Sequence, residues 1–328
     1  MIRAGRHCAG LTLIELVVVM VVMAILATVA VEMIEPKVDQ ARFESTRRTI
    51  ENVTQAIVSE RKNADGTYTH TGFLADLGRL PRPTVSGSVL TLGELWLRPD
   101  TVAPFAVRPA DRATGGVPTD REDPEVLVAC GWNGPYLQLA IHSQSLVDGW
   151  GTELVSGGLT YSHLRTRDAA GNESAVQDVN DPIYGVRSLG QDNAVGGTAP
   201  YDIDLPTELS INTGRIAGVV QGSVSIDGSP PVDQQVIVQL YGPDPETGLI
   251  RVDRQLLSGG AATYTFDDAD AQYNVKVGTH AIRAYLDADA NGQPDPGMDS
   301  QIFYFDIRPG INVISDLNIR SSVQTGNP

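Results

Sequence analysis

The chain has 328 residues, with 24 lysines and arginines against 40 aspartates and glutamates and a formal net charge of −16. This acidic balance excludes a nucleic-acid-binding surface, which needs a basic face, so we expect no nucleic-acid partner. The 33 glycines, 20 prolines and 6% aromatic residues favour turn-rich β-structure over a helical bundle. The two cysteines, Cys8 and Cys130, are too few for a disulfide framework or a zinc site. The length leaves room for about two or three small domains.

The N-terminal segment combines a basic start with a long apolar run. Arg3 and Arg6 precede the stretch 11–31, whose only charged residue is Glu15. Such a run is long enough to cross a bilayer as a helix of about 20 residues, and the arginines predict a cytoplasmic N-terminus. A secretory signal peptide fits poorly, because its apolar region is shorter and is followed by small residues. A plain membrane anchor remains an alternative, although it leaves unexplained a carboxylate that costs about 2.5–3.5 kcal/mol in a membrane helix.

The string Gly10-Leu11-Thr12-Leu13-Ile14-Glu15-Leu16 resembles the class III signal of type IV prepilins and pseudopilins. The resemblance implies that a membrane peptidase cuts between Gly10 and Leu11, and that the new N-terminal residue is methylated. It also implies that Glu15, the fifth mature residue, lies near the N-terminal amine of a neighbouring subunit during assembly. An amine and a carboxylate that are each costly in lipid neutralise one another in this arrangement. Leu11 departs from the family, which usually has phenylalanine there.

Apolar residues continue at helical spacing beyond this run, and the segment 63–66 is a typical stop signal. We therefore predict one helix over residues 11–62, of which 11–31 span the membrane. Its first part is apolar on all sides, so lipid or a bundle of identical helices must cover it. Its second part is amphipathic, so a globular domain must cover its apolar face.

Residues 63–208 predict a separate globular unit of α+β class, in which a small antiparallel sheet packs on the long helix. Three blocks within it resemble the major pseudopilin of type II secretion systems. They are the strings WNGPYL and DGWG, followed by SLGQDN with its downstream Gly-Gly and Asp-Ile pairs. The stretch 72–128 has no counterpart in that family and is interpreted as an insertion.

The third block, residues 188–204, holds a calcium ion in the family. Calcium takes about six to eight oxygen ligands from carboxylates and backbone carbonyls. Asp192 and Asp202 match family positions that supply carboxylates, and the Leu189 carbonyl is a candidate backbone ligand. Residues 198–200, Thr-Ala-Pro, replace a further acid or amide of the family, so a solvated acidic turn remains the alternative.

The C-terminal part has a different pattern. The polar segment 209–214 predicts a linker, and residues 215–321 alternate apolar and polar positions in about eight short strands. This pattern is typical of an all-β sandwich domain. The strings 218–231 and 236–241 resemble carboxypeptidase-regulatory-like or transthyretin-like domains, a similarity that transfers no activity. Residues 322–328 predict a flexible tail.

A second acidic loop lies inside this predicted domain. Asp287, Asp289, Asn291 and Asp295 reproduce the spacing D-x-D-x-N-G-x-x-D of an EF-hand loop. Met298 stands where the loop should end in a bidentate glutamate, and the flanking segments are strand-like, so this is not an EF-hand. A calcium loop between strands and a polar turn both remain open.

Catalytic motifs are missing from the sequence: it has no G-x-S-x-G, H-E-x-x-H or P-loop string. We therefore expect a structural protein rather than an enzyme, namely a pseudopilin-like filament subunit of a type II secretion or type IV pilus-like system. It would lie in the cytoplasmic (inner) membrane as a single-pass protein with its bulk periplasmic or extracellular. Expected partners are other pilin or pseudopilin subunits, the prepilin peptidase and the membrane. A minor pilin or tip adhesin, or an anchored binding module that does not polymerise, remain alternatives.

Overall fold

The computed structural model describes residues 13–320 with internal gaps. The gaps are residues 65–67, 111–122, 140–142, 158–160, 169, 230, 232–233, 259 and 289–297. The predicted leader 1–10, the cleavage pair Gly10 and Leu11, and the predicted tail 322–328 lie outside the described residues. The described chain is a mixed protein, in which one long helix is followed by several mostly antiparallel sheets.

The helix α1, Leu13–Ile57, is a continuous element of 45 residues. The sequence predicts its end at residue 62, but the chain leaves the helix after Ile57. Residues Ser59–Lys62 form the strand β1, which pairs antiparallel with β2, Tyr68–Thr71. Four of the five residues that extended the predicted helix are therefore used for a hairpin.

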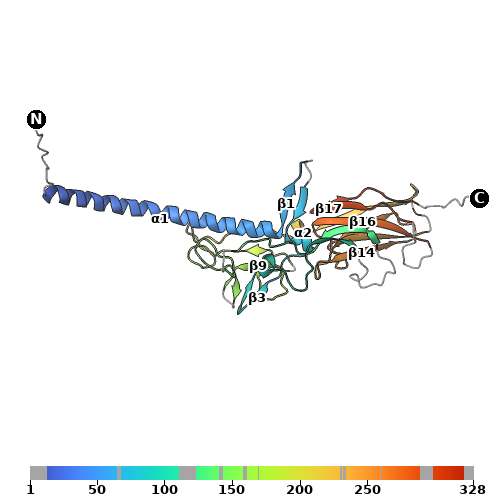
Figure 1. The fold of residues 1–328 in the computed structure, drawn as a ribbon, viewed down its shortest axis with the longest axis horizontal. Helices are drawn as coiled ribbons and strands as arrows, with labels where there is room; N and C mark the ends of the chain where they lie inside the picture. The colour runs from blue at the N-terminus through green and yellow to red at the C-terminus, as the bar shows by residue number, and fades with distance from the viewer. Residues whose placement is uncertain are drawn as a thin grey trace, which may run out of the picture.

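The two ends of α1 have different surroundings. Residues 13–42, which we call the stem, project away from the rest of the molecule (Figure 1). Apolar stem side chains are exposed, including Leu13 at 83% and Met20 at 65%. From Thr46 onward one face of the helix is buried, with Ile50 and Val53 in the core. Among the described residues, no helical stretch is both long and apolar enough to meet the requirements for crossing a membrane.

The buried half of α1 packs against a head of short elements. The helices are α2, Phe73–Leu77, and the 3₁₀ turn η1, Gly93–Leu95. One four-stranded sheet has the order β3-β4-β7-β8, with strands Thr84–Ser86, Val89–Thr91, Ser156–Gly157 and Tyr161–Ser162. A three-stranded sheet has the order β10-β9-β11, with strands Glu173–Ala175, Leu164–Arg167 and Gly185–Val186. In its described residues the head thus has two small sheets besides the β1–β2 hairpin, where the sequence predicted one.

The predicted linker 209–214 packs against the head instead of standing free. Leu209 and Ile211 are buried in the same hydrophobic core as Ile50 of α1. The short helix α3, Thr213–Ile216, follows directly, and its Ile216 belongs to this core as well. Alternate apolar residues face the head while polar ones face solvent, which is why the composition resembled a linker.

The C-terminal domain, residues 218–319, consists of two four-stranded sheets. The first joins β15, β12, β18 and β19, which are Thr263–Asp267, Gly218–Ile226, Gly310–Val313 and Leu317–Ile319. The second has the order β14-β13-β16-β17, with Ile250–Leu257, Gln235–Pro243, Gly278–Asp287 and Phe303–Ile307. Strand β12 pairs in parallel with β18 and β19, and the other pairs are antiparallel. Residues from both sheets, such as Phe266 and Ile282, share one core.

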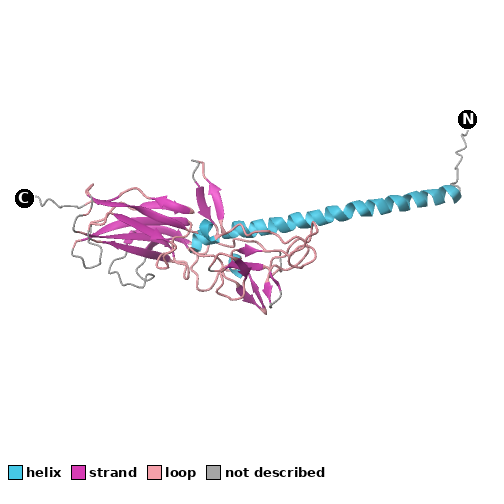
Figure 2. Cartoon of the chain, turned by 180° about the vertical axis from the view of Figure 1, so that it is seen from behind, coloured by secondary structure: helices cyan, strands magenta, loops and turns pink. Residues whose placement is uncertain are grey.

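The predicted insertion 72–128 supplies a second hairpin, β5 and β6, at Ala106–Ala110 and Asp123–Cys130. Val126, Val128 and Cys130 of this hairpin pack with Tyr241 and Ala281 of the C-terminal domain in one apolar cluster. Cys130 is a buried free thiol, and burial raises its pKa to about 11. Figure 2 shows the resulting order along the molecule: stem, head beside the helix, and C-terminal domain beyond it.

Candidate functional site

The N-terminal signal is described only from Leu13 onward. Glu15 lies in the first turn of α1 and is exposed, at the outer end of the stem. Gly10 and Leu11, the predicted cleavage pair, lie outside the described residues. The described apolar side chains around Glu15 are exposed on all sides of the helix. A helix of this kind is stable only when lipid or other helices cover it.

Where the stem meets the head, Phe43 of α1 packs against two aromatic side chains of the head, and we call these three residues the collar: Phe43, Trp150 and Tyr201. The ring centroid of Phe43 lies 6.4 Å from that of Trp150 and 6.0 Å from that of Tyr201, both in edge-on geometry. Such pairs add stability beyond the area they bury. The collar therefore fixes the direction in which the stem leaves the head.

A glycine lets the chain beside the collar touch the helix backbone. A Cβ atom on Gly149 would lie 1.9 Å from the carbonyl oxygen of Arg42. The Gly149 N–H donates to Thr46 Oγ1 at 2.8 Å, and Thr46 Oγ1 donates to the Arg42 carbonyl at 3.0 Å. Any side chain at this position would push the 148–151 turn off α1.

The neighbouring Asp148 joins two of the predicted sequence blocks. Its Oδ1 accepts hydrogen bonds from the backbone N–H groups of Trp150 and Thr152, both at 2.9 Å. Its Oδ2 accepts from Ser188 Oγ at 2.7 Å. Asp148 is buried, so all of these bonds are shielded from water. The DGWG block and the 188–204 loop therefore form one support for the helix.

The first block binds the short helices α2 and η1 of the head. Trp132 Nε1 donates to the Glu94 carbonyl at 2.9 Å, and the Tyr136 hydroxyl donates to Asp76 Oδ2 at 2.9 Å. The Asn133 N–H donates to the same hydroxyl at 2.9 Å. The residues of this block therefore serve packing and turns within the head. Burial raises the pKa of Asp76 to about 6, although its hydrogen bonds oppose the shift.

The predicted calcium loop 188–204 is folded tightly on itself. The Gln191 N–H donates to the Tyr201 carbonyl at 2.8 Å, and Leu189 is buried beside it. Asp192 Oδ1 accepts from the Ala194 N–H at 3.0 Å. Among the described residues, no three or more histidine, cysteine, aspartate or glutamate side chains converge as a metal site would require. The described carboxylates are therefore too few to complete a calcium site, and backbone carbonyl oxygens would have to supply most of its ligands.

The second acidic loop is described only at its start. Asp287 ends β16 and is buried. Asp289, Asn291 and Asp295 lie outside the described residues.

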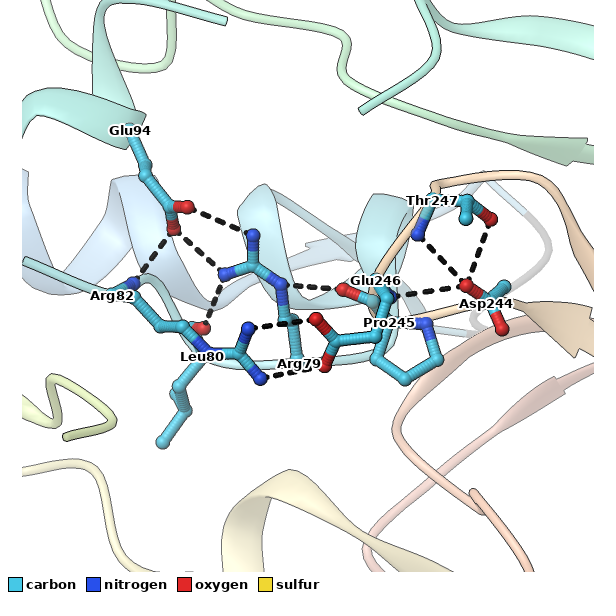
Figure 3. A network of polar contacts seen from close by, with 8 residues as sticks. All are labelled: Arg79, Leu80, Arg82, Glu94, Asp244, Pro245, Glu246 and Thr247. Carbon is cyan, nitrogen blue, oxygen red and sulfur yellow. Dashed lines mark hydrogen bonds and ion pairs between the residues drawn. The ribbon is translucent and has the colours of Figure 1, made fainter. Parts of the chain in front are cut away.

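The sequence analysis missed a polar contact between the head and the C-terminal domain, which we call the clamp (Figure 3). Arg79 donates from both terminal nitrogens to Glu94, at 2.7 and 2.9 Å, and from Nε to the Pro245 carbonyl at 2.5 Å. Arg82 binds Glu246 through two further bonds, at 2.8 and 2.6 Å. Arg79 and Glu94 are buried, whereas Glu246 is exposed. No local motif reveals this contact, because its two halves are far apart in the sequence.

Comparison with known proteins places one segment of the chain in a family. Residues 5–31 match the prokaryotic N-terminal methylation motif. No curated protein matches the chain. The protein therefore carries a prepilin-like N-terminal signal, of the kind found in type IV pilin-like proteins that a prepilin peptidase processes.

Proposed function

We propose that this protein is a pilin-like subunit, cleaved between Gly10 and Leu11 and assembled through its stem into a filament of a type II secretion or type IV pilus-like system. One observation carries the proposal: the match to the methylation motif at residues 5–31 coincides with a projecting helix whose apolar side chains are exposed. In this proposal the apolar part of the stem, up to residue 31, lies in the cytoplasmic membrane before assembly. Afterwards it lies among the stems of other pilin-type subunits.

The assembly step follows from the position of Glu15. Cleavage after Gly10 creates an amine at Leu11, and Glu15 follows one helical turn later. In a parallel bundle the carboxylate of one subunit pairs with the amine of a neighbour, which removes two charges that are each costly in an apolar environment. Head-to-tail repetition of such a contact generates an open filament rather than a closed ring.

The test uses the protein from its native host. Mass spectrometry should find a mature chain that starts at a methylated Leu11. Glu15→Ala should reduce incorporation into sheared fibres at least tenfold while leaving the amount in the membrane unchanged. Glu44→Ala, which removes an exposed acid of the same helix, is the matched control and should incorporate normally.

Two outcomes would overturn the proposal. An uncut N-terminus would show that the proposed cleavage between Gly10 and Leu11 does not occur. Normal incorporation of the Glu15→Ala variant would remove the charge pairing. Complete absence of the processed wild-type protein from fibres would favour the alternative, an anchored binding module that does not polymerise.

Calcium binding remains a separate proposal for the two acidic loops. The described residues of the 188–204 loop bring few carboxylates together. The test must therefore include an outcome that excludes calcium binding. If Asp192 and Asp202 bind the ion, calcium should raise the melting temperature of the detergent-solubilised chain by a few degrees, and Asp192→Ala should abolish the shift. Loss of the shift in Asp287→Asn instead would assign the ion to the second loop. Identical melting with calcium and with chelator would exclude both loops.

A further inference from the structure

A cavity of about 540 Å³ opens between the two small sheets of the head. Its wall comes from β4, β7 and β8 of one sheet, from β9 and β10 of the other, and from the 188–204 loop. Figure 1 shows these sheets, marked by β3 and β9, on one side of α1. The volume lies in the range of about 300–1,000 Å³ that is usual for small-molecule sites.

Two arginines on this wall share one carboxylate. Arg165 donates from Nε to Glu173 Oε1 at 2.6 Å, and Arg187 donates from Nη2 to Glu173 Oε2 at 2.7 Å. The three side chains are only 18–19% exposed, so salt and water screen their charges incompletely. Two positive charges against one negative charge leave this cluster with a positive charge in excess.

The two arginines also keep hydrogen-bond donors that the protein does not use. Among the described residues, Arg165 donates only from Nε, so its two terminal nitrogens are free. Arg187 Nε is enclosed and has no hydrogen-bond partner in the described part of the chain. Enclosing a charged donor without a partner costs free energy. An anion beside these guanidinium groups would reduce that cost, and a carboxylate matches their planar geometry.

A nearby acid restricts the charge that a ligand can carry. Asp204 lines the same cavity, and its Oδ1 accepts the Gly196 N–H at 3.2 Å. Within the described ranges, Asp204 forms no ion pair with Arg165 or Arg187. Its negative charge therefore repels a second negative group on the ligand. A ligand with one negative charge fits this wall better than a phosphate or a dicarboxylate.

The rest of the wall is largely apolar. Val176 and Leu189 are buried, Leu90 is half-buried and Val195 is 73% exposed. Covering such side chains with an apolar body contributes about 25 cal/mol per Å² of surface removed from water. The arginines alone would accept any small anion, whereas this surface favours an organic one.

We propose that this cavity binds a small organic acid with one carboxylate and a short apolar body. The carboxylate accepts hydrogen bonds from Arg165 and Arg187. The apolar body packs against Leu90, Leu189 and Val195. All of these residues belong to the head, so the inference is independent of the proposed cleavage and filament assembly.

The test titrates the full chain in detergent with isovalerate and measures the heat of binding. Isovaleramide has the same shape without the charge, and acetate has the charge without the apolar body. Each should bind about tenfold more weakly than isovalerate, because each lacks one of the two interactions. Phosphate should bind no better than acetate. Equal or tighter binding of any of these probes, or no binding of isovalerate, would overturn the proposal.

Both a free acid and the last residue of a peptide carry the proposed chemistry. N-acetylalanylvaline ends in a carboxylate beside an apolar side chain, as a peptide does. Tighter binding of this compound than of isovalerate would identify a peptide C-terminus as the ligand. Weaker binding would identify a free acid.

Substitutions locate the ligand in the cavity. Arg187→Gln removes one guanidinium and should weaken isovalerate binding about tenfold. Val195→Asp leaves the ion pairs intact and adds a negative charge to the wall, so it should weaken binding as well, even where Arg187→Gln does not fold. Val313→Asp, at a valine of the C-terminal domain that is 72% exposed, is the matched control and should bind like the wild type. Unchanged binding by the Val195→Asp variant would place the ligand elsewhere and contradict the proposal.

Discussion

At the scale of single residues, Asp76 shows how burial makes a structural residue sensitive to pH. Its carboxyl group accepts the Tyr136 hydroxyl at 2.9 Å, and desolvation raises its pKa from 3.8 to about 6. In the unfolded chain the group ionises near pH 4. Between about pH 4 and 6 the folded state therefore holds a proton that the unfolded state has lost, so raising the pH across this window lowers the free energy of unfolding.

We expect the Asp76→Asn substitution to remove this pH dependence. The wild-type protein should lose about 2–3 kcal/mol of stability between pH 4 and 7 through this group, since one pKa unit corresponds to about 1.4 kcal/mol. The asparagine variant should lack that contribution, because its amide does not titrate. Urea unfolding at several pH values measures the difference. Glu208→Gln, which changes an exposed acid, should follow the wild-type profile. Identical profiles for Asp76→Asn and the wild type would contradict the assignment.

At the scale of elements, local pattern predicted some boundaries well and others poorly. Among the short strands that the alternation within 215–321 predicts, the segment 280–286 corresponds to β16, Gly278–Asp287, and the segment 217–226 to β12, Gly218–Ile226. These strands are predictable because one face of each packs into the core that the two sheets share, which makes their segments rich in apolar residues. The other face of β16 is buried as well, with Ala281 against the β5–β6 hairpin.

The end of α1 was predicted five residues too late for the opposite reason. The segment Ser59–Lys62 is polar and mostly exposed, and its sequence fits a helix as well as a strand. Pairing with Tyr68–Thr71 decides its structure, and a local pattern contains no information about that partner. The same holds for residues 209–214, whose alternate burial depends on the head that they cover.

The candidate site likewise has parts that the sequence predicts and parts that only the folded structure shows. The signal around Gly10, Leu11 and Glu15 is readable from sequence because its chemistry depends on spacing within one helix. The link from Asp148 to Ser188 could be suspected from the order of the sequence blocks, but its geometry requires the folded head. The collar depends on Phe43, which no motif singled out.

At the scale of the whole molecule, the predicted insertion 72–128 has a definite role. It supplies Arg79, Arg82 and Glu94 of the clamp, and it supplies the hairpin that packs on the C-terminal domain. Sequence patterns could not show this, because charged residues usually lie on a solvated surface. Without these contacts, the C-terminal domain would be connected to the head only through a flexible segment. The insertion therefore accounts for the straight arrangement of α1 and the C-terminal domain.

The clamp provides the sharpest test of that arrangement. Arg79→Met should leave the buried Glu94 carboxylate without its partner and cost about 3–5 kcal/mol, since removing one member of a buried ion pair strands the other charge. Arg82→Met breaks a more exposed pair, with Glu246, and should cost at most about 1 kcal/mol.

Calorimetry on the full chain in detergent distinguishes coupling between the domains from a general loss of stability. The wild-type head and C-terminal domain should unfold in one transition, and Arg79→Met should split this into two. The double substitution Arg79→Met with Glu94→Met should recover part of the loss, because it removes the stranded charge along with its partner. If Arg79→Met unfolds in a single transition with the same midpoint as Arg82→Met, the clamp does not couple the domains. The C-terminal domain would then be free to swing away from the axis of α1.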